Sequence, residues 1–545
     1  MNEPDQRGPD GTSGPKASPS RRAHAISVPE DVLHRFNARV LDPSTALQVP
    51  GQSAIRSTVY VGNRLIISGL ADQETRQALD DAAARNGLKV VDDEDEQSPR
   101  TRELARRAGL DDSMYFSRSV RLAPAGDGPA APPDAWSVLQ TFRALVGRAD
   151  PAQQRVALDH LMTATPFTHG SPFTHGSPFT HGSPFTHGSP FTHGSGADEY
   201  GEPGYGGRAP VNWVGPAPHR RSDDELGSRR PVVAVLDTGV GWHPWLGDDI
   251  VQRNLTVGGE PIGIQDPLTD PEQTGVIDDP YEGTLDSDSG HGTFIAGLIR
   301  QTCPDADILA VRVMASDGAV SESELLDALK KLVIRQKLAE QQGDASGIID
   351  IVSLSLGYYH EQPDDISFDP QLLQPLQALS DCGVTVVVSA GNDSTDRPML
   401  PAAFTPFADG QIMGFSASCV PLISVGALNP DRTIALFSNA GPWVTCHRPG
   451  AALVSTFPVT FDASGQASYR VDVPGDGARS TIDPDNFHSG FGTWSGTSFA
   501  APILAGELAQ CLLDGDCGPL DPPDAASAVS RAWAALHQQI GLDLP

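Results

Sequence analysis

The chain has 545 residues, of which 39% are hydrophobic and 20% are charged, and its formal net charge is −31 at pH 7. Composition of this kind is typical of a globular protein, and the length allows about three or four domains. The negative charge argues against nucleic acid or an anionic membrane surface as the main partner, because phosphate groups are bound by basic surfaces.

No run of apolar residues approaches the length of about 18 that would predict a membrane-spanning helix. The N-terminus has no apolar segment of the kind found in secretory signal peptides. This favours a cytoplasmic location, although secretion by an unrecognised route stays open. The six cysteines have no C-x-x-C spacing, so the sequence predicts neither a structural zinc site nor a disulfide framework.

The N-terminal quarter of the chain predicts a small folded domain behind a disordered tail. Residues 1–25 are rich in Gly, Pro, Ser and Arg and contain almost nothing to bury, so disorder is expected. Residues 26–160 predict a small α+β domain with the element order β-α-β-β-α, and no motif in it points to chemistry. The expected strands cover 57–61, 64–68, 89–91 and 115–122, and the expected helices cover 73–86 and 135–146.

A repeat separates this domain from the rest of the chain. The hexad Pro-Phe-Thr-His-Gly-Ser occurs five times without change over residues 166–195. Its histidines could be metal ligands, but imidazoles spaced along a Pro- and Gly-rich chain have no fixed geometry that selects a metal. The simpler interpretation is a disordered, low-complexity linker over residues 161–230.

From residue 231 to residue 545 the chain alternates short apolar runs with helical segments. Apolar runs of this kind are typical of strands that are buried on both faces of a parallel sheet. Their alternation with helices predicts an α/β domain with a doubly wound, mostly parallel sheet. The strands are expected at 232–236, 308–313, 348–356, 384–388 and 422–427, and two of the helices at 322–341 and 371–382.

Four polar residues stand at strand–helix junctions of this domain, namely Asp237, His291, Asn392 and Ser498. Each by itself is explained more simply by a turn or a helix cap. In doubly wound sheets, however, active residues gather where the carboxyl ends of strands meet helix N-termini. Together they supply what acyl transfer needs: a hydroxyl nucleophile, an imidazole base, a carboxylate that orients the base, and an amide that can donate to an oxyanion.

Residues 231–545 resemble the subtilisin-like serine peptidases, or subtilases. Three motifs carry the resemblance in chain order: Asp237-Thr-Gly, His291-Gly-Thr, and Gly496-Thr-Ser498-Phe-Ala-Ala-Pro. The resemblance implies a serine endopeptidase that hydrolyses peptide bonds of polypeptide substrates through an acyl-enzyme. It also implies that Asp237, His291 and Ser498 are the catalytic residues.

The same resemblance assigns further residues. Ser-Ala-Gly-Asn392 matches the asparagine that donates to the oxyanion in this family. Asp286 and Asp288 could bind calcium, as some relatives do, although solvated loop carboxylates are the simpler interpretation and no other cofactor is expected. Ser355, Leu356 and Gly357 match the segment that pairs with extended substrate and lines the S1 pocket, and Ser389, Ala390 and Gly391 would form the other wall.

The N-terminal domain has roughly the element order of the inhibitory prodomains of such peptidases. On this order alone it could be prodomain-like and contact the peptidase domain in cis. A competing hypothesis is a binding or scaffold protein that keeps the subtilase fold but is catalytically silent. A missing member of the triad would favour that hypothesis, because triads act as a unit; none is missing here.

Overall fold

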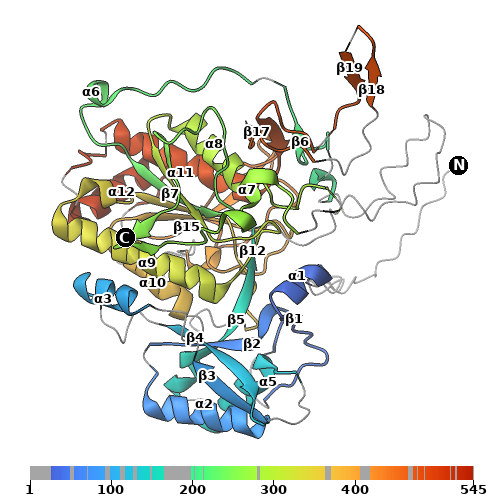
Figure 1. Ribbon diagram of the computed structural model, residues 1–545. Coiled ribbons are helices and arrows are strands. Elements are labelled where there is room, and N and C mark those ends of the chain that lie inside the picture. Colours follow the sequence, from blue (N-terminus) through green and yellow to red (C-terminus); the bar gives the residue numbers. More distant parts are fainter. Residues whose placement is uncertain are drawn as a thin grey trace, which may run out of the picture.

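The computed structural model contains a smaller N-terminal part, residues 26–164, and a larger C-terminal part, residues 198–543, which contact each other (Figure 1). The tail predicted to be disordered and all five hexads lie outside the described residues. The structure describes residues 26–543 except 27, 50–53, 70, 93–97, 111–116, 127–131, 148–149, 165–197, 202, 213, 279–280, 282, 363–369, 406–417, 464–469, 476, 484, 516 and 522–523.

A seven-stranded parallel sheet forms the centre of the C-terminal part, with the order β16-β15-β14-β13-β7-β11-β8. The first strand, β7, lies between β11 and β13, so the order reverses at its carboxyl end. This confirms the predicted doubly wound α/β fold. The strands are β7 (Val232–Asp237), β8 (Val251–Gln252), β11 (Asp307–Arg312), β13 (Ile351–Leu354), β14 (Thr385–Ser389), β15 (Ile423–Leu428) and β16 (Cys446–Pro449).

Helices cover both faces of this sheet. In β7, Val233 and Val235 pack in the cluster with α8, α11 and α12, whereas Ala234 and Leu236 pack in the cluster with α9 and α10. Burial on both faces explains why the strand sequences are continuously apolar. The helices are α8 (His291–Thr302), α9 (Glu322–Gln342), α10 (Pro370–Asp381), α11 (Thr497–Leu513) and α12 (Ala525–Ile540).

The N-terminal part contains an antiparallel sheet with the order β3-β4-β2-β5, and β1 pairs with β2. Helices α2 and α5 cover one face, where Trp136 and Phe142 pack against Leu65 and Leu158. The elements are α1 (Glu30–Arg35), β1 (Ala38–Val40), β2 (Val59–Ile67), α2 (Gln73–Arg85), β3 (Leu88–Asp92), α3 (Pro99–Arg107), β4 (Arg118–Pro124), α5 (Ala135–Val146) and β5 (Val156–Thr163).

Strand β5 connects the two parts. It pairs with β2 on one side and antiparallel with β12 (Ala319–Ser321) of the C-terminal part on the other, as Figure 1 shows. The predicted domain boundary at residue 160 therefore falls inside a strand. Residues 161–164, which were assigned to the linker, are ordered because they complete a sheet with a distant segment.

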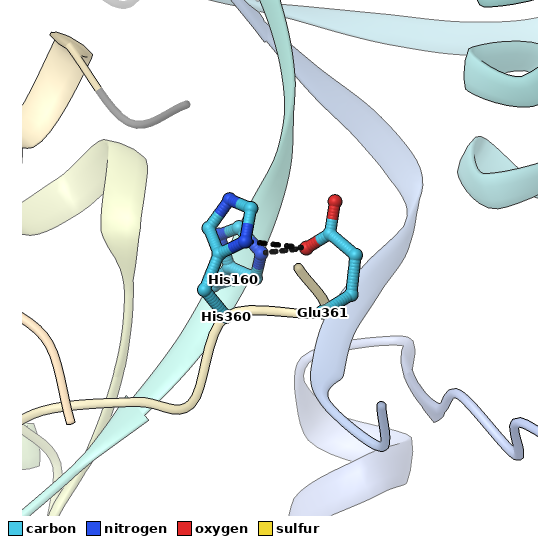
Figure 2. A group of neighbouring side chains, drawn as sticks. All are labelled: His160, His360 and Glu361. Atoms are coloured by element: carbon cyan, nitrogen blue, oxygen red, sulfur yellow. Dashed lines mark hydrogen bonds and ion pairs between the residues drawn. The ribbon is translucent and has the colours of Figure 1, made fainter. Parts of the chain in front are cut away.

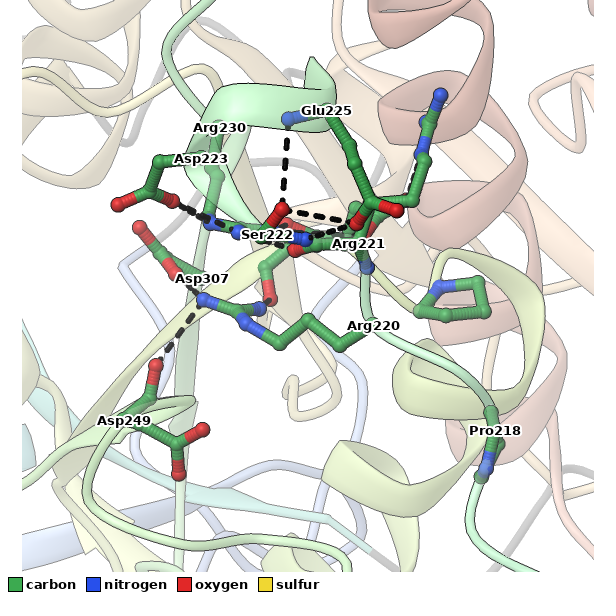
Figure 3. A network of polar contacts seen from close by, with 12 residues as sticks. Pro218, Arg220, Arg221, Ser222, Asp223, Glu225, Arg230, Asp249 and Asp307 are labelled. Carbon is green, nitrogen blue, oxygen red and sulfur yellow. Dashed lines mark hydrogen bonds and ion pairs between the residues drawn. The ribbon is translucent and has the colours of Figure 1, made fainter.

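The C-terminal end of the predicted linker is also ordered, since most of residues 198–230 lie on the C-terminal part. Arg220 donates to the backbone oxygens of Ala306 at 2.8 Å and Asp249 at 3.0 Å, and it also pairs with Asp307 (Figure 3). The prediction of a linker up to residue 230 is therefore wrong in this respect. Gly- and Pro-rich composition suggested flexibility, but arginines in the segment bind acidic loops of the folded part.

Among the described residues, no helix is long and apolar enough to cross a bilayer. The remaining helices and strands are short. They are β6 (Ala209–Pro210), α6 (Asp223–Leu226), β9 (Thr256–Val257), β10 (Glu260–Pro261), α7 (Pro271–Thr274), β17 (Leu453–Thr456), β18 (Arg470–Val473), β19 (Gly477–Ser480) and β20 (Phe491–Trp494), with 3₁₀ turns at Pro151–Arg155, Asp198–Gly201, Pro267–Thr269, Ala345–Gly347 and Ala402–Phe404.

Candidate active site

Asp237 and His291 meet at the point where the sheet order reverses. Asp237 is the last residue of β7, and His291 is the first residue of α8. The N–H of His291 Nδ1 donates to Asp237 Oδ1 at 2.7 Å, and both side chains are buried. Burial alone would lower the pKa of His291, but the charge and hydrogen bond of Asp237 raise it. The pair is therefore arranged to hold a proton on the imidazole.

Ser498 lies in the first turn of α11, directly before Phe499 in the chain. The ring of the next residue, Phe499, has its centre 5.1 Å from that of His291. The Ser498 hydroxyl donates to the backbone oxygen of Ala164 at 3.2 Å. Within the described chain, His291 Nε2 is buried and has no hydrogen-bond partner. The structure thus joins Asp237 to His291, while the Ser498 hydroxyl contacts a peptide carbonyl of the N-terminal part.

That carbonyl ends an extended segment that lies between two segments of the C-terminal part. Thr163 and Gly357 exchange two backbone hydrogen bonds of 3.0 Å each, and Ala164 N–H donates to the backbone oxygen of Gly318 at 3.0 Å. On the other edge, β5 pairs with β12. Gly357, which was predicted to pair with extended substrate, therefore pairs here with a strand of its own chain.

The other predicted pocket residues lie next to the start of α11. Ser355 Oγ donates to the backbone oxygen of Ser498 at 3.0 Å, and Gly391 N–H donates to Thr497 Oγ1 at 3.0 Å. Leu356, Ser389 and Ala390 are buried at the ends of β13 and β14. The two predicted walls thus come from neighbouring parallel strands, as their positions in the sequence suggested.

Asn392 also contacts the first turn of α11. Its Oδ1 accepts hydrogen bonds from Thr497 N–H at 2.7 Å and from Thr497 Oγ1 at 2.8 Å. This fixes the orientation of the amide, because the oxygen is the atom that faces two donors. The amide nitrogen is the donor group of this side chain, and Thr497, which holds the oxygen, directly precedes Ser498 in the chain. Such an arrangement can stabilise negative charge that develops near the hydroxyl.

A cluster of buried side chains joins the two parts of the chain near this site (Figure 2). The imidazole of His160 in β5 lies between two carboxylates: Nδ1 is 2.8 Å from Glu322 Oε2, and Nε2 is 3.1 Å from Glu361 Oε2. His360 Nδ1 lies 3.6 Å from the same oxygen of Glu361. Candidate ligand atoms of His160, His360 and Glu361 lie within 4.8 Å of one another, which is close enough for one metal ion.

The contacts inside this cluster favour an ion-pair network. Gln362 N–H donates to His360 Nδ1 at 3.0 Å, so that lone pair is already engaged. Arg143 lies 3.3 Å from the other oxygen of Glu361. Burial alone would lower the pKa of His160, but its hydrogen bonds to the two carboxylates raise it to about 10. Protonated His160 and Arg143 then balance both carboxylates without a metal ion.

Asp286 and Asp288, the residues considered for calcium, make different contacts. Asp286 Oδ2 accepts from the backbone N–H groups of Ile277 at 2.7 Å and Asp278 at 3.1 Å. Asp288 is buried, and its Oδ2 accepts from Ser287 Oγ at 2.9 Å. Neither belongs to a group of three side chains spaced for one metal ion, as far as the described residues go. Solvated loop carboxylates stay the simpler interpretation of the sequence, and calcium binding stays the alternative.

Two residues at this site were missed by sequence analysis. Ala164 was assigned to the linker, although the segment before it, Val156–Thr163, begins with three apolar residues and also contains Leu161 and Met162. Glu272, whose buried carboxylate lies beside the Asp237 loop, stands in a polar segment without a motif. No local pattern could have identified Glu272, because its partners are distant in the sequence.

Comparison with known proteins agrees with the motifs. A model of the subtilase family matches residues 228–515. Serine protease AprX of Bacillus subtilis is 27% identical over 322 residues, which cover 54% of this chain and 59% of AprX. The intracellular serine protease of Paenibacillus polymyxa is 29% identical over 290 residues, 51% of this chain and 65% of that protein. The major intracellular serine protease of Bacillus subtilis is 26% identical over 292 residues, 51% of this chain and 66% of that protein. The chain therefore spans less than two thirds of the length of these relatives.

Proposed function

Because the chain belongs to the subtilase family, we propose that it is a serine endopeptidase that hydrolyses peptide bonds through an acyl-enzyme on Ser498. The observation that carries this proposal is the buried hydrogen bond of 2.7 Å between His291 and Asp237, beside a Ser498 hydroxyl that lies 3.2 Å from a peptide oxygen. A hydroxyl, an imidazole and a carboxylate in this order are the groups of a serine peptidase triad.

In the proposed reaction, Ser498 Oγ attacks the carbonyl carbon of the scissile bond. His291 Nε2 takes the hydroxyl proton and later gives it to the leaving amine. Asp237 keeps the other imidazole nitrogen protonated and stabilises the imidazolium. The Asn392 amide and the Ser498 backbone N–H donate to the oxyanion. Water then hydrolyses the ester and restores the hydroxyl.

A fluorophosphonate probe tests this assignment. The purified protein, with its N-terminal part released, should be labelled on Ser498, and the variant Ser498→Ala should not be labelled. Labelling that persists in the variant would locate the nucleophile elsewhere. Failure to label a folded wild-type protein, together with no hydrolysis of peptides, would instead favour the catalytically silent scaffold.

Replacing Asn392 with alanine should lower kcat by about 10²–10³-fold with little change in KM, as the loss of an oxyanion donor does in subtilisin. The effect falls on kcat because the amide donates most strongly to the charge of the transition state. Steady-state kinetics on a small peptide amide measure it. An unchanged kcat in a folded Asn392→Ala protein would remove this residue from the site.

The N-terminal part is proposed to be both an inhibitor and the first substrate of the same site, as a prodomain would be. Two observations support this role. Residues 161–164 pair with β12 and Gly318 on one side and with Gly357 on the other, and the Ala164 carbonyl oxygen accepts the Ser498 hydroxyl hydrogen bond. Any other extended polypeptide would have to displace this strand. Attack at this carbonyl would break the bond between Ala164 and Thr165.

Incubation of the purified full-length chain should therefore yield a new N-terminus at Thr165, and intact mass should give a fragment that ends at Ala164. Peptide sequencing of the larger fragment measures the cut. Deletion of the five hexads should leave this cut and the kcat for a small peptide unchanged, since they follow the scissile bond. Cleavage only at other positions would contradict the proposal that the bond after Ala164 is the first substrate.

The proposed substrates are polypeptides bound in extended form, and a cytoplasmic location stays an expectation. The names of two relatives describe them as intracellular serine proteases. Fractionation of cells that express the chain with an antibody against its C-terminal part would locate it.

A further inference from the structure

A buried glutamate lies beside the Asp237–His291 pair and has no role in the mechanism above. Glu272 belongs to the short helix α7, and its side chain is 1% exposed. Glu272 Oε1 accepts from Thr238 Oγ1 at 2.6 Å and from Gly290 N–H at 3.0 Å. Thr238 follows Asp237 and Gly290 precedes His291 in the chain, so one carboxylate oxygen bridges the neighbours of both residues.

The second carboxylate oxygen extends the same connection. Glu272 Oε2 accepts from Thr293 Oγ1 at 2.5 Å, and that hydroxyl oxygen accepts from Gly241 N–H at 2.7 Å. Thr238 Oγ1 also accepts from Gly292 N–H at 2.9 Å. Glu272 therefore ties the loop that follows β7 to the first turn of α8, which are the two segments that carry the carboxylate and the imidazole.

Ionisation of Glu272 at this buried place has a desolvation cost. Burial, together with the nearby charges of Asp270 and Asp237, raises the pKa of Glu272 to about 8 in spite of the threonine hydrogen bonds. A neutral glutamine of the same shape would have a smaller desolvation cost. Its oxygen could accept from Thr238 and Gly290, but its NH₂ group could only donate to Thr293 Oγ1. A titratable carboxylate at this buried place, hydrogen-bonded to the neighbours of Asp237 and His291, therefore points to a function. In the part of the chain that the structure describes, it also interacts with His291, Arg208 and Arg312.

We infer that Glu272 is a positioning residue for the proposed peptidase reaction: it holds Asp237 against His291, and its negative charge favours the imidazolium that forms during attack. Glu272 acts through Thr238 and the first turn of α8, and it touches neither substrate nor the reacting atoms. The inference rests on the proposed function. When the carboxylate is protonated only the holding role remains, so the reaction is faster at a pH at which Glu272 is ionised.

The variant Glu272→Gln keeps the shape of the side chain and removes its charge. The experiment compares kcat/KM of the full-length wild-type and variant proteins, after release of the N-terminal part, on a peptide amide between about pH 6 and pH 10. The ratio of wild type to variant should be near one at about pH 6.5 and rise to on the order of tenfold at about pH 9.5, as expected for one charge that is hydrogen-bonded to the residue before His291. The KM values should stay equal.

The matched control is Glu260→Gln, which removes one charge from β10. Its kcat/KM should depend on pH as that of the wild type does. A ratio that is the same at every pH, whatever its size, overturns the inference, because the inferred effect requires the ionised carboxylate. A wild type without Ser498-dependent hydrolysis refutes the proposed function instead.

A second variant covers the case in which Glu272→Gln does not fold. Thr293→Val keeps the glutamate and removes one hydrogen bond to its ionised form. Loss of that bond should raise the pKa of Glu272 further. The increase in kcat/KM that follows from ionisation of Glu272 should therefore occur at a higher pH than in the wild type. If kcat/KM of Thr293→Val increases at the same pH as that of the wild type, the inference is overturned.

Discussion

Replacing Ser498 with alanine should lower kcat for a peptide amide by about 10⁶-fold, the loss measured for the corresponding change in subtilisin, a member of the same family. Without the hydroxyl no acyl-enzyme forms, and the imidazole and carboxylate cannot act without a nucleophile. The residual rate comes from binding and from the oxyanion donors. Active-site titration and steady-state kinetics on the Ser498→Ala protein measure the loss.

The matched control is Ser495→Ala in the same segment. Ser495 Oγ donates to the backbone oxygen of Gly206 at 2.7 Å and accepts from Ala452 N–H at 2.8 Å, so its loss should affect stability by about 1 kcal/mol but not kcat. The Ser498→Ala chain should also remain uncut between Ala164 and Thr165. Activity of Ser498→Ala within about tenfold of the wild type would contradict the proposed nucleophile.

The N-terminal part should leave the cut chain more readily as the pH rises from about 6.5 to about 10. His160 lies in β5, between Glu322 and Glu361 of the C-terminal part, and the two hydrogen bonds raise its pKa to about 10 against the burial that would lower it. Arg143 also faces Glu361, and the rings of Tyr358 and His360 contact the imidazole.

The sign follows from the raised pKa. A histidine that is charged in the complex and has an ordinary pKa of 6.5 when released stabilises the complex fully below pH 6.5 and loses this contribution as the pH rises to about 10. One linked proton weakens binding by up to about tenfold for each pH unit in this window. Asp159, whose pKa burial raises to about 6, titrates below the window.

A recognition site for a sequence-specific protease, inserted among the hexads of the Ser498→Ala protein, allows the chain to be cut without its own activity. The dissociation constant of the two fragments, measured by surface plasmon resonance, should rise by about 10³-fold between about pH 7 and pH 10. In His160→Gln it should be larger by about 10²-fold or more near pH 7, because the two buried carboxylates lose a cation.

The exposed His219→Gln serves as the control and should behave as the unchanged chain does. If the dissociation constant of the wild type is flat across this range, His160 is not the group that governs release. If it falls as the pH rises, the charge balance described for the cluster is wrong.

Local sequence was sufficient for the architecture of the C-terminal part and for its family. The apolar run before Asp237 predicted a strand buried on both faces, and β7 lies at the centre of a parallel sheet. The motifs around Asp237, His291 and Ser498 predicted subtilase membership, which the family model confirms. Such features depend on residues that are close together in the sequence: the hydrophobic pattern of a strand, the residues at the start of a helix and the order within a motif.

Contacts between distant segments were decided only by the tertiary structure. Composition predicted a linker from residue 161 to residue 230, yet Ala164 lies against Ser498 and Arg220 binds the loop before β11. Residues 161–164 are ordered because β12, which lies far along the chain, supplies the partner for their backbone.

The same holds for two buried titratable groups of this protein. His160 and Glu272 stand in segments without a motif, and their properties come from partners that are distant in the sequence. The sequence by itself determined the family, the sheet and the candidate catalytic residues. The structure decided which strand contacts Ser498 and which buried groups lie nearby, because desolvation and hydrogen bonding depend on neighbours that only folding brings together.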